Sequence, residues 1–173
     1  MDQQPRSQLQ PPSQEESQRI QSLVMTLRIV SIALILSSLM FVMISYQRVV
    51  PQKELSNLFE IFQNPATMVF GIWALMMFVV SFILPNFLFR NSLKRDTNLS
   101  VLKVLQIYFV SHIIGYALLE SMSIMGFVTA IGVHQPRAAL IFAAPAIAAM
   151  AIRFPSLDSI LQKAENILGR KIA

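Results

Sequence analysis

Glu120 is the only Asp, Glu, Lys or Arg in a long apolar run of the chain, residues 104–133. An ionised carboxylate near the middle of a bilayer is costly, so such a group must be protonated, paired or hydrated. A neutral carboxyl that donates one hydrogen bond can exchange its proton, or trade it for Na⁺, when water reaches it. Glu120 is therefore a candidate ion- or proton-binding residue.

Further polar side chains share a helical face with this acid. At about 100° per residue, His112, Tyr116, Glu120 and Ser123 fall within an arc of about 80°. Histidine titrates near neutral pH and can relay a proton. We therefore group His112, Tyr116 and Ser123 with Glu120 as a candidate ion or proton site.

The neighbouring stripe of the same helix carries small residues, which allow a second backbone to approach closely. Gly115 and Gly126 are the predicted helix-packing positions. The opposite face is aliphatic and is expected to contact lipid. The stripe that contains Glu120 is thus predicted to face the interior of the protein.

No Lys or Arg lies inside the apolar runs of the predicted spans, 29–46, 66–89, 104–133 and 138–152, so an ion pair to Glu120 is not expected. A hydroxyl group is the expected hydrogen-bond partner, and five side chains are candidates: Ser31, Ser37, Ser38, Ser81 and Tyr116. Such a bond can serve an ion site or simply join two helices, and the sequence leaves both interpretations open.

The elements that must position these residues are transmembrane helices. Hydrophobic residues make up 54% of the chain and charged residues only 13%, and the charges cluster between long apolar runs. These runs predict an all-α, polytopic membrane protein with four spans, at about 27–47, 66–89, 104–133 and 137–154. Pro85 is expected to kink or end the second helix, with Asn86 bonding locally where the backbone ladder fails.

The remaining segments flank a transmembrane domain at 23–154. Residues 1–22 are rich in Gln and Pro and are predicted to be a disordered cytoplasmic tail. Residues 155–173 are predicted to form an amphipathic cytoplasmic helix capped by Ser156. A short amphipathic helix on the membrane face is predicted from Leu55, Leu58, Phe59 and Phe62.

The orientation follows from the basic residues, which number eleven on one predicted side and three on the other. Because basic loops are retained in the cytoplasm, both termini are expected there. The net charge of +5 is explained by this orientation, so nucleic acid is not an expected partner.

The sequence lacks the residues and motifs that several kinds of catalytic and binding site require. There is no cysteine, no HExxH motif, no glycine-rich phosphate loop and no serine, histidine and aspartate set that could meet at one depth. We therefore expect no enzymatic activity, no metal site and no cofactor.

Residues 117–131 resemble the carboxylate helix of rotary ATPase c (proteolipid) subunits, in which a carboxylate is followed by Ile-x-Gly and small apolar residues. The resemblance implies that Glu120 is the ion-binding carboxylate and that Gly126 packs closely on a neighbouring helix. The glycine-repeat helix of c subunits has no counterpart here. The overall layout resembles small four-helix bacterial inner-membrane proteins of uncharacterised function.

Two functions are consistent with these patterns. The first is an accessory or structural subunit that packs with other membrane subunits or with a second copy, for which the alanine-rich fourth span offers small surfaces. That span can equally close against the third helix of its own chain. The second function is a proton- or cation-linked transport element that uses Glu120.

Overall fold

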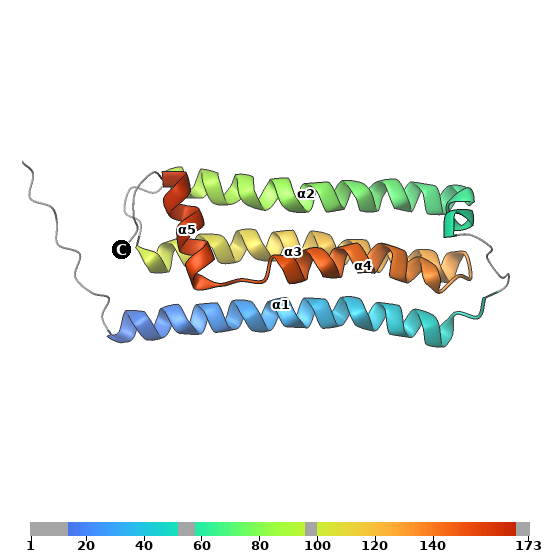
Figure 1. The fold of residues 1–173 in the computed structure, drawn as a ribbon, viewed down its shortest axis with the longest axis horizontal. Helices are drawn as coiled ribbons and strands as arrows, with labels where there is room; N and C mark the ends of the chain where they lie inside the picture. Colours follow the sequence, from blue (N-terminus) through green and yellow to red (C-terminus); the bar gives the residue numbers. More distant parts are fainter. Residues whose placement is uncertain (1–13, 52–57, 96–99, 169–173) are drawn as a thin grey trace, which may run out of the picture.

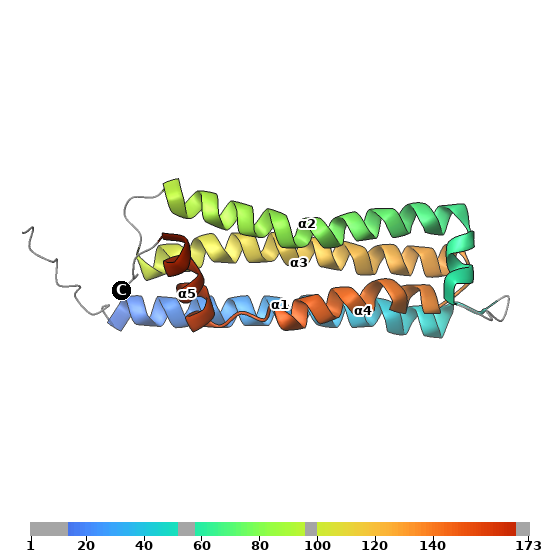
Figure 2. The same ribbon diagram turned by 45° about the horizontal axis from the view of Figure 1, so that its top comes forward.

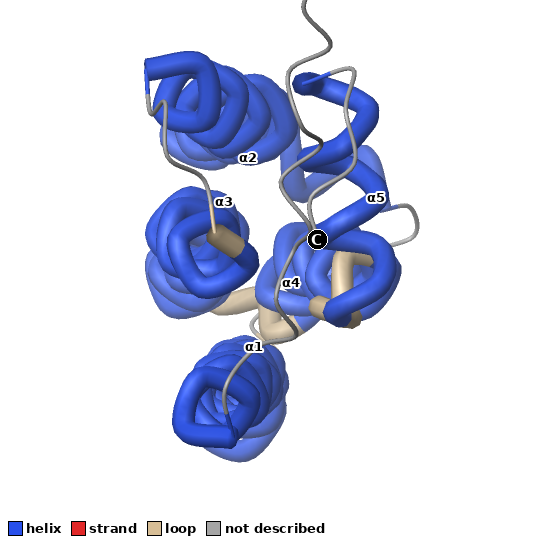
Figure 3. The backbone as a smooth tube through the Cα atoms, turned by 90° about the vertical axis from the view of Figure 1, so that its left-hand side faces the viewer, coloured by secondary structure: helices blue, strands red, loops and turns tan. Residues whose placement is uncertain are grey.

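The computed structural model describes residues 14–51, 58–95 and 100–168, and these form an all-helical bundle. Its elements are α1 (Gln14–Arg48), the 3-10 helix η1 (Leu58–Gln63), α2 (Pro65–Arg95), α3 (Val101–Gly132), α4 (Arg137–Ile152) and α5 (Leu157–Leu168). Figures 1 and 2 show α1 to α4 running along one axis, with α5 lying across the end where α1 begins. Viewed along the axis, α1 and α2 lie on opposite sides, with α3 and α4 between them (Figure 3).

Within the described residues, α1, α2 and α3 are each long and apolar enough to cross a membrane. The pair formed by α4 and α5 is bent by 81° and meets the same test together, which brings the total to four if it is counted. The chain is therefore a helical protein with three to four candidate membrane spans.

Small residues at intervals of seven explain how α1 and α2 approach the centre of the bundle. Ser31, Ser38 and Ser45 on α1, and Thr67, Ala74 and Ser81 on α2, are all at most 1% exposed. A seven-residue repeat keeps positions on one side of a helix, and small side chains there let the backbones pack closely. Most other apolar residues of these two helices face outward, as a lipid environment requires.

The alanine-rich helix α4 packs mainly on its own chain. It follows α3 after a tight turn in which His134 has a φ of 51°. It contacts mainly α3 and α1, and its fully buried positions are Ala138, Ala139, Ala143, Ala146 and Met150. A Cβ atom on Gly126 of α3 would lie 2.6 Å from the Cβ atom of Phe142, so these two helices are in close contact.

Two predicted segments differ in the structure. Residues 14–22, predicted as part of a disordered tail, form the first turns of α1; an ion pair of 2.7 Å between Arg19 and Glu15 and the burial of Ile20 stabilise them. The amphipathic helix predicted after the first span is a 3-10 helix over its described part, and Leu55 lies outside the described residues. Residues 1–13 also lie outside them.

Candidate functional site

Glu120 lies at the edge of the buried face of α3 rather than within it. Its side chain is half-buried, with Leu119 and Ser123 buried on one side and Ala117 and Ile124 exposed on the other. Residues spaced by four advance about 40° around a helix at each step. The series that is buried at His112 and Tyr116 has therefore turned toward the outer surface by the time it reaches Glu120.

None of the five predicted hydroxyl partners bonds to Glu120. Ser31, Ser81 and Tyr116 donate to the backbone oxygens of Leu27, Phe78 and Met150, respectively. Ser38 is buried without a hydrogen-bond partner, as is Ser123 of the predicted site. Within the described part of the chain, Glu120 has neither an ion pair nor a hydrogen bond, so none of the described residues satisfies its carboxyl group.

His112 and Tyr116 instead belong to a stack of rings along the inner face of α3. The ring centroids of Tyr108 and His112 lie 5.2 Å apart, and those of His112 and Tyr116 lie 4.1 Å apart. Phe89 of α2 extends the stack by an edge-to-face contact with Tyr108. The structure therefore brings His112 and Tyr116 together, with Tyr108 as a neighbour that the sequence did not single out.

The hydrogen bonds of this stack join α3 to α1 and α4. The Ser31 hydroxyl donates to the Leu27 oxygen of its own helix and also lies 3.3 Å from His112 Nε2, within hydrogen-bonding distance. The Tyr116 hydroxyl donates to the Met150 oxygen in the last turn of α4, where helix carbonyls lack partners within the helix. Both side chains thus have interhelical structural roles.

The second polar cluster forms where Pro85 interrupts the backbone hydrogen bonds of α2. Proline has no N–H, so the Ser81 carbonyl loses its usual partner. Arg153, directly after α4, supplies one: its Nη1 atom donates to the Ser81 oxygen at 2.8 Å. The prediction that α2 could end at Pro85 is wrong, because the helix continues to Arg95.

Asn86 behaves as predicted, since its Nδ2 atom donates to the Phe82 oxygen. Its Oδ1 atom accepts a hydrogen bond from Lys163 of α5. Burial, and then repulsion from the nearby Arg153 guanidinium, lower the pKa of Lys163. A basic residue of the amphipathic helix is thus directed back toward the break in α2.

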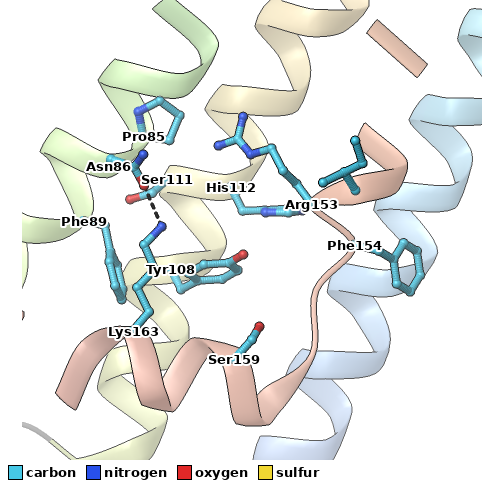
Figure 4. Close-up of a pocket in the computed structure, with 11 residues that line it drawn as sticks. Pro85, Asn86, Phe89, Tyr108, Ser111, His112, Arg153, Phe154, Ser159 and Lys163 are labelled. Carbon is cyan, nitrogen blue, oxygen red and sulfur yellow. Dashed lines mark hydrogen bonds between the residues drawn. The ribbon is translucent and has the colours of Figure 1, made fainter. Parts of the chain in front are cut away.

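These contacts surround a cavity of about 220 Å³ at the junction of α4 and α5. Figure 4 shows Lys163 and Ser159 reaching into it from α5, Arg153 from the α4 end, and Tyr108 from α3. The described lining residues include no Asp or Glu. The cavity is therefore a positively charged hollow at one end of the bundle, and Glu120 is not part of it.

The sequence predicted that the backbone hydrogen bonds of α2 fail near Pro85 and Asn86. It did not identify Arg153, which comes from a distant part of the chain, as the donor to the freed Ser81 carbonyl. Among the described residues, no group of three or more His, Asp or Glu side chains is placed to hold a metal ion.

Comparisons of the chain with protein-family models, with curated proteins and with solved structures found no match.

Proposed function

We propose that this chain is an accessory or structural subunit that lies in a bacterial inner membrane, with four spans and both termini in the cytoplasm. In this proposal its task is to pack against another membrane subunit, which it contacts through the outer edge of α3 around Glu120.

The distribution of basic residues along the bundle supports the orientation. Among the described residues, the half of the bundle in which α1 and α3 begin carries Arg19, Arg28, Arg90, Lys94, Arg95, Lys103 and Lys163, and the other half carries Arg48 and Arg137. Arg153 lies between the two groups, bonded to Ser81 near the middle of α2. Basic residues are enriched on the cytoplasmic side of membrane proteins. Both ends of the described chain lie at the basic end, as an even number of spans requires (Figure 1).

The assignment of α4 as the fourth span rests on the difference between α4 and α5. The sixteen residues of α4 contain no charge after Arg137 and extend roughly 24 Å at about 1.5 Å per residue, close to the thickness of the hydrocarbon layer. Helix α5 has an apolar side, which buries Ile160 and Ala164, and a polar side. Such a helix suits the membrane surface, and Figure 1 shows it across the end of the bundle.

The observation that carries the proposed function is the half-buried Glu120 without a partner. A charged acid near the bilayer centre costs roughly 3 kcal/mol on insertion scales, and a neutral one still requires a hydrogen bond there. The residues beside it, Ala117 and Ile124, are exposed, so a second transmembrane helix can reach the carboxyl group. The expected partner helix carries a hydrogen-bond donor or a cation at the same depth.

Site-specific photo-crosslinking in native membranes tests this proposal. A photoreactive residue at Ile124, beside Glu120, should give one discrete adduct with a second membrane protein or a second copy. The matched control is Ile83, an outward-facing isoleucine of α2 that is 62% exposed. Equal adduct patterns from both positions, or none from Ile124, would contradict the proposal.

Substitution of the acid separates contact from packing. Glu120→Leu should abolish the Ile124 adduct by removing the polar group, whereas Glu120→Gln retains a hydrogen-bonding side chain and should preserve it. Phe127→Leu, about two helical turns farther along the same edge, serves as a control for changes in packing. Loss of the adduct in the control and not in Glu120→Leu would show that the acid is not the recognition element.

The alternative, a proton- or cation-linked transport element, depends on the same carboxyl group. It differs in the expected effect of Glu120→Gln, which cannot exchange a proton and should abolish ion-dependent activity while assembly persists. We favour the accessory role because His112 and Tyr116, the expected companions of an ion site, are engaged in contacts with α1 and α4.

A further inference from the structure

The cavity between α2, α3 and the junction of α4 and α5 concentrates positive charge. Arg153 and Lys163 both line it, and no acid is among its described lining residues. Each cation makes its described hydrogen bond to a neutral oxygen, Arg153 to the Ser81 carbonyl and Lys163 to the Asn86 amide. Each also lies over an aromatic ring, Arg153 over Phe82 and Lys163 over Phe89, and no described lining residue neutralises either charge.

Both cations retain donors for a ligand. A guanidinium group has five N–H donors and an ammonium group has three, and the described bonds use one from each. Two hydroxyl groups add to this set, because Tyr108 and Ser159 also line the cavity, below the two cations in the close-up (Figure 4). Two cations with neighbouring hydroxyls form a donor set that suits an oxyanion.

The size of the cavity limits what it can hold. At about 220 Å³ it is smaller than the roughly 300–1,000 Å³ of pockets for drug-sized ligands, so it suits a single small group rather than a whole cofactor. Its rim is apolar on one side, where Ile152 is 85% exposed and Phe154 is 41% exposed. A ligand with a small anionic group next to a hydrocarbon portion matches both features.

The position of the cavity agrees with such a ligand. Its lining joins α5, which crosses one end of the bundle (Figure 1), to Asn86 and Phe89 at the end of the second predicted span, so in the proposed topology it lies near the cytoplasmic headgroups. Basic pockets between transmembrane helices on the cytoplasmic side commonly receive anionic headgroups.

We propose that this cavity binds the phosphate group of an anionic phospholipid. Arg153 and Lys163 pair with the phosphate oxygens, Tyr108 and Ser159 provide further hydrogen bonds, and the acyl chains leave over Ile152 and Phe154. The bound phosphate would then join α2, α4 and α5 at the point where Pro85 breaks the backbone ladder of α2. This site is independent of the contact proposed at Glu120.

Lipid titration of the delipidated full-length chain, followed by native mass spectrometry, tests this proposal. Phosphatidylglycerol should bind about tenfold more tightly than phosphatidylcholine, because the choline ammonium of phosphatidylcholine offsets the charge of its phosphate and is repelled by the two cations. Lys163→Gln should remove most of that preference. Lys94→Gln removes a cation from the same end of the bundle outside the cavity and should change the preference less than about twofold.

A second pair of variants keeps the test decisive if Lys163→Gln fails to fold. Ser159→Glu places an acid at the mouth of the cavity, and the Ser159 side chain makes only local contacts with Ser156, so folding should persist. It should abolish the preference for phosphatidylglycerol. Gln162→Glu adds the same charge to an exposed position of α5 that does not line the cavity, and it should leave the preference intact.

Three results would overturn the proposal. Equal affinities for the two lipids would show that the cavity does not select an anionic headgroup. Equal losses in Ser159→Glu and Gln162→Glu would indicate a diffuse surface charge instead of a site. Displacement of phosphatidylglycerol by an equal concentration of inorganic phosphate would assign the site to free phosphate and not to a lipid.

Discussion

His112 and Glu120 lie on the same helix, eight residues apart, and their surroundings differ sharply. The His112 side chain is 4% exposed, stacks between two tyrosines and bonds to Ser31 of α1. Glu120 lies at the outer edge of the helix and has no partner within the described chain. The role of a polar residue in such a helix therefore depends on its angular position. The inner face of α3 contacts the rest of the bundle, and its outer edge is the surface that we propose for another molecule.

The largest loss of stability is expected when the inner face of α3 is disturbed at Gly126. A methyl group there would meet the Phe142 Cβ atom at 2.6 Å and the Ala139 oxygen at 3.1 Å, and neither can move without shifting α4. Gly126→Ala should lower the free energy of unfolding by about 2–3 kcal/mol. The measurement is unfolding in mixed detergent micelles.

Gly132, on the same helix, is the matched control for this substitution. No atom lies within 4 Å of a Cβ added there, so Gly132→Ala should change the free energy of unfolding by less than about 0.5 kcal/mol. If the two alanine variants were equally stable, the close contact between α3 and α4 described here would be wrong.

A smaller effect is expected from removing one hydroxyl group of the inner face. Tyr116→Phe preserves the ring stack and leaves the Met150 carbonyl without its donor. A buried oxygen without a partner costs about 1–2 kcal/mol, so the variant should unfold that much more easily in the same assay. Tyr46→Phe, at a tyrosine that is 50% exposed on α1, should have no comparable effect.

The smallest effect on the isolated chain is expected at the outer edge. Glu120→Gln removes no described intramolecular contact, so the free energy of unfolding of the purified chain should change by less than about 0.5 kcal/mol. Destabilisation as large as that of Tyr116→Phe would place Glu120 inside the bundle and remove the difference between the two regions.

The sequence was informative about which segments are apolar helices and less so about where their polar groups point. The long uncharged runs predicted the positions of α1 to α4, and the four-residue spacing predicted that His112 and Tyr116 share a face. The same spacing placed Glu120 with them, because an arc of about 80° was treated as one face, whereas the boundary of burial falls within that arc.

The features that the sequence did not predict involve contacts between segments that are distant in the chain. The continuation of α2 through Pro85 depends on Arg153, which is 68 residues away in the sequence, and on Lys163, which α5 directs toward Asn86. Local propensity alone favours a break at Pro85. The beginning of α1 was also missed, since its first turns are stabilised by the Glu15–Arg19 pair and by contacts of Ile20 in the cluster that includes Ile160 of α5.

The accessibility of the Glu120 carboxyl group tests the central claim most directly. A hydrophobic carbodiimide reacts with protonated carboxyl groups that it reaches from the lipid phase, and the labelled residue can be identified by mass spectrometry. We predict that Glu120 is labelled in the purified chain and protected in native membranes, where the partner subunit covers it. Equal labelling in both preparations would contradict the claim that the outer edge of α3 is a contact surface.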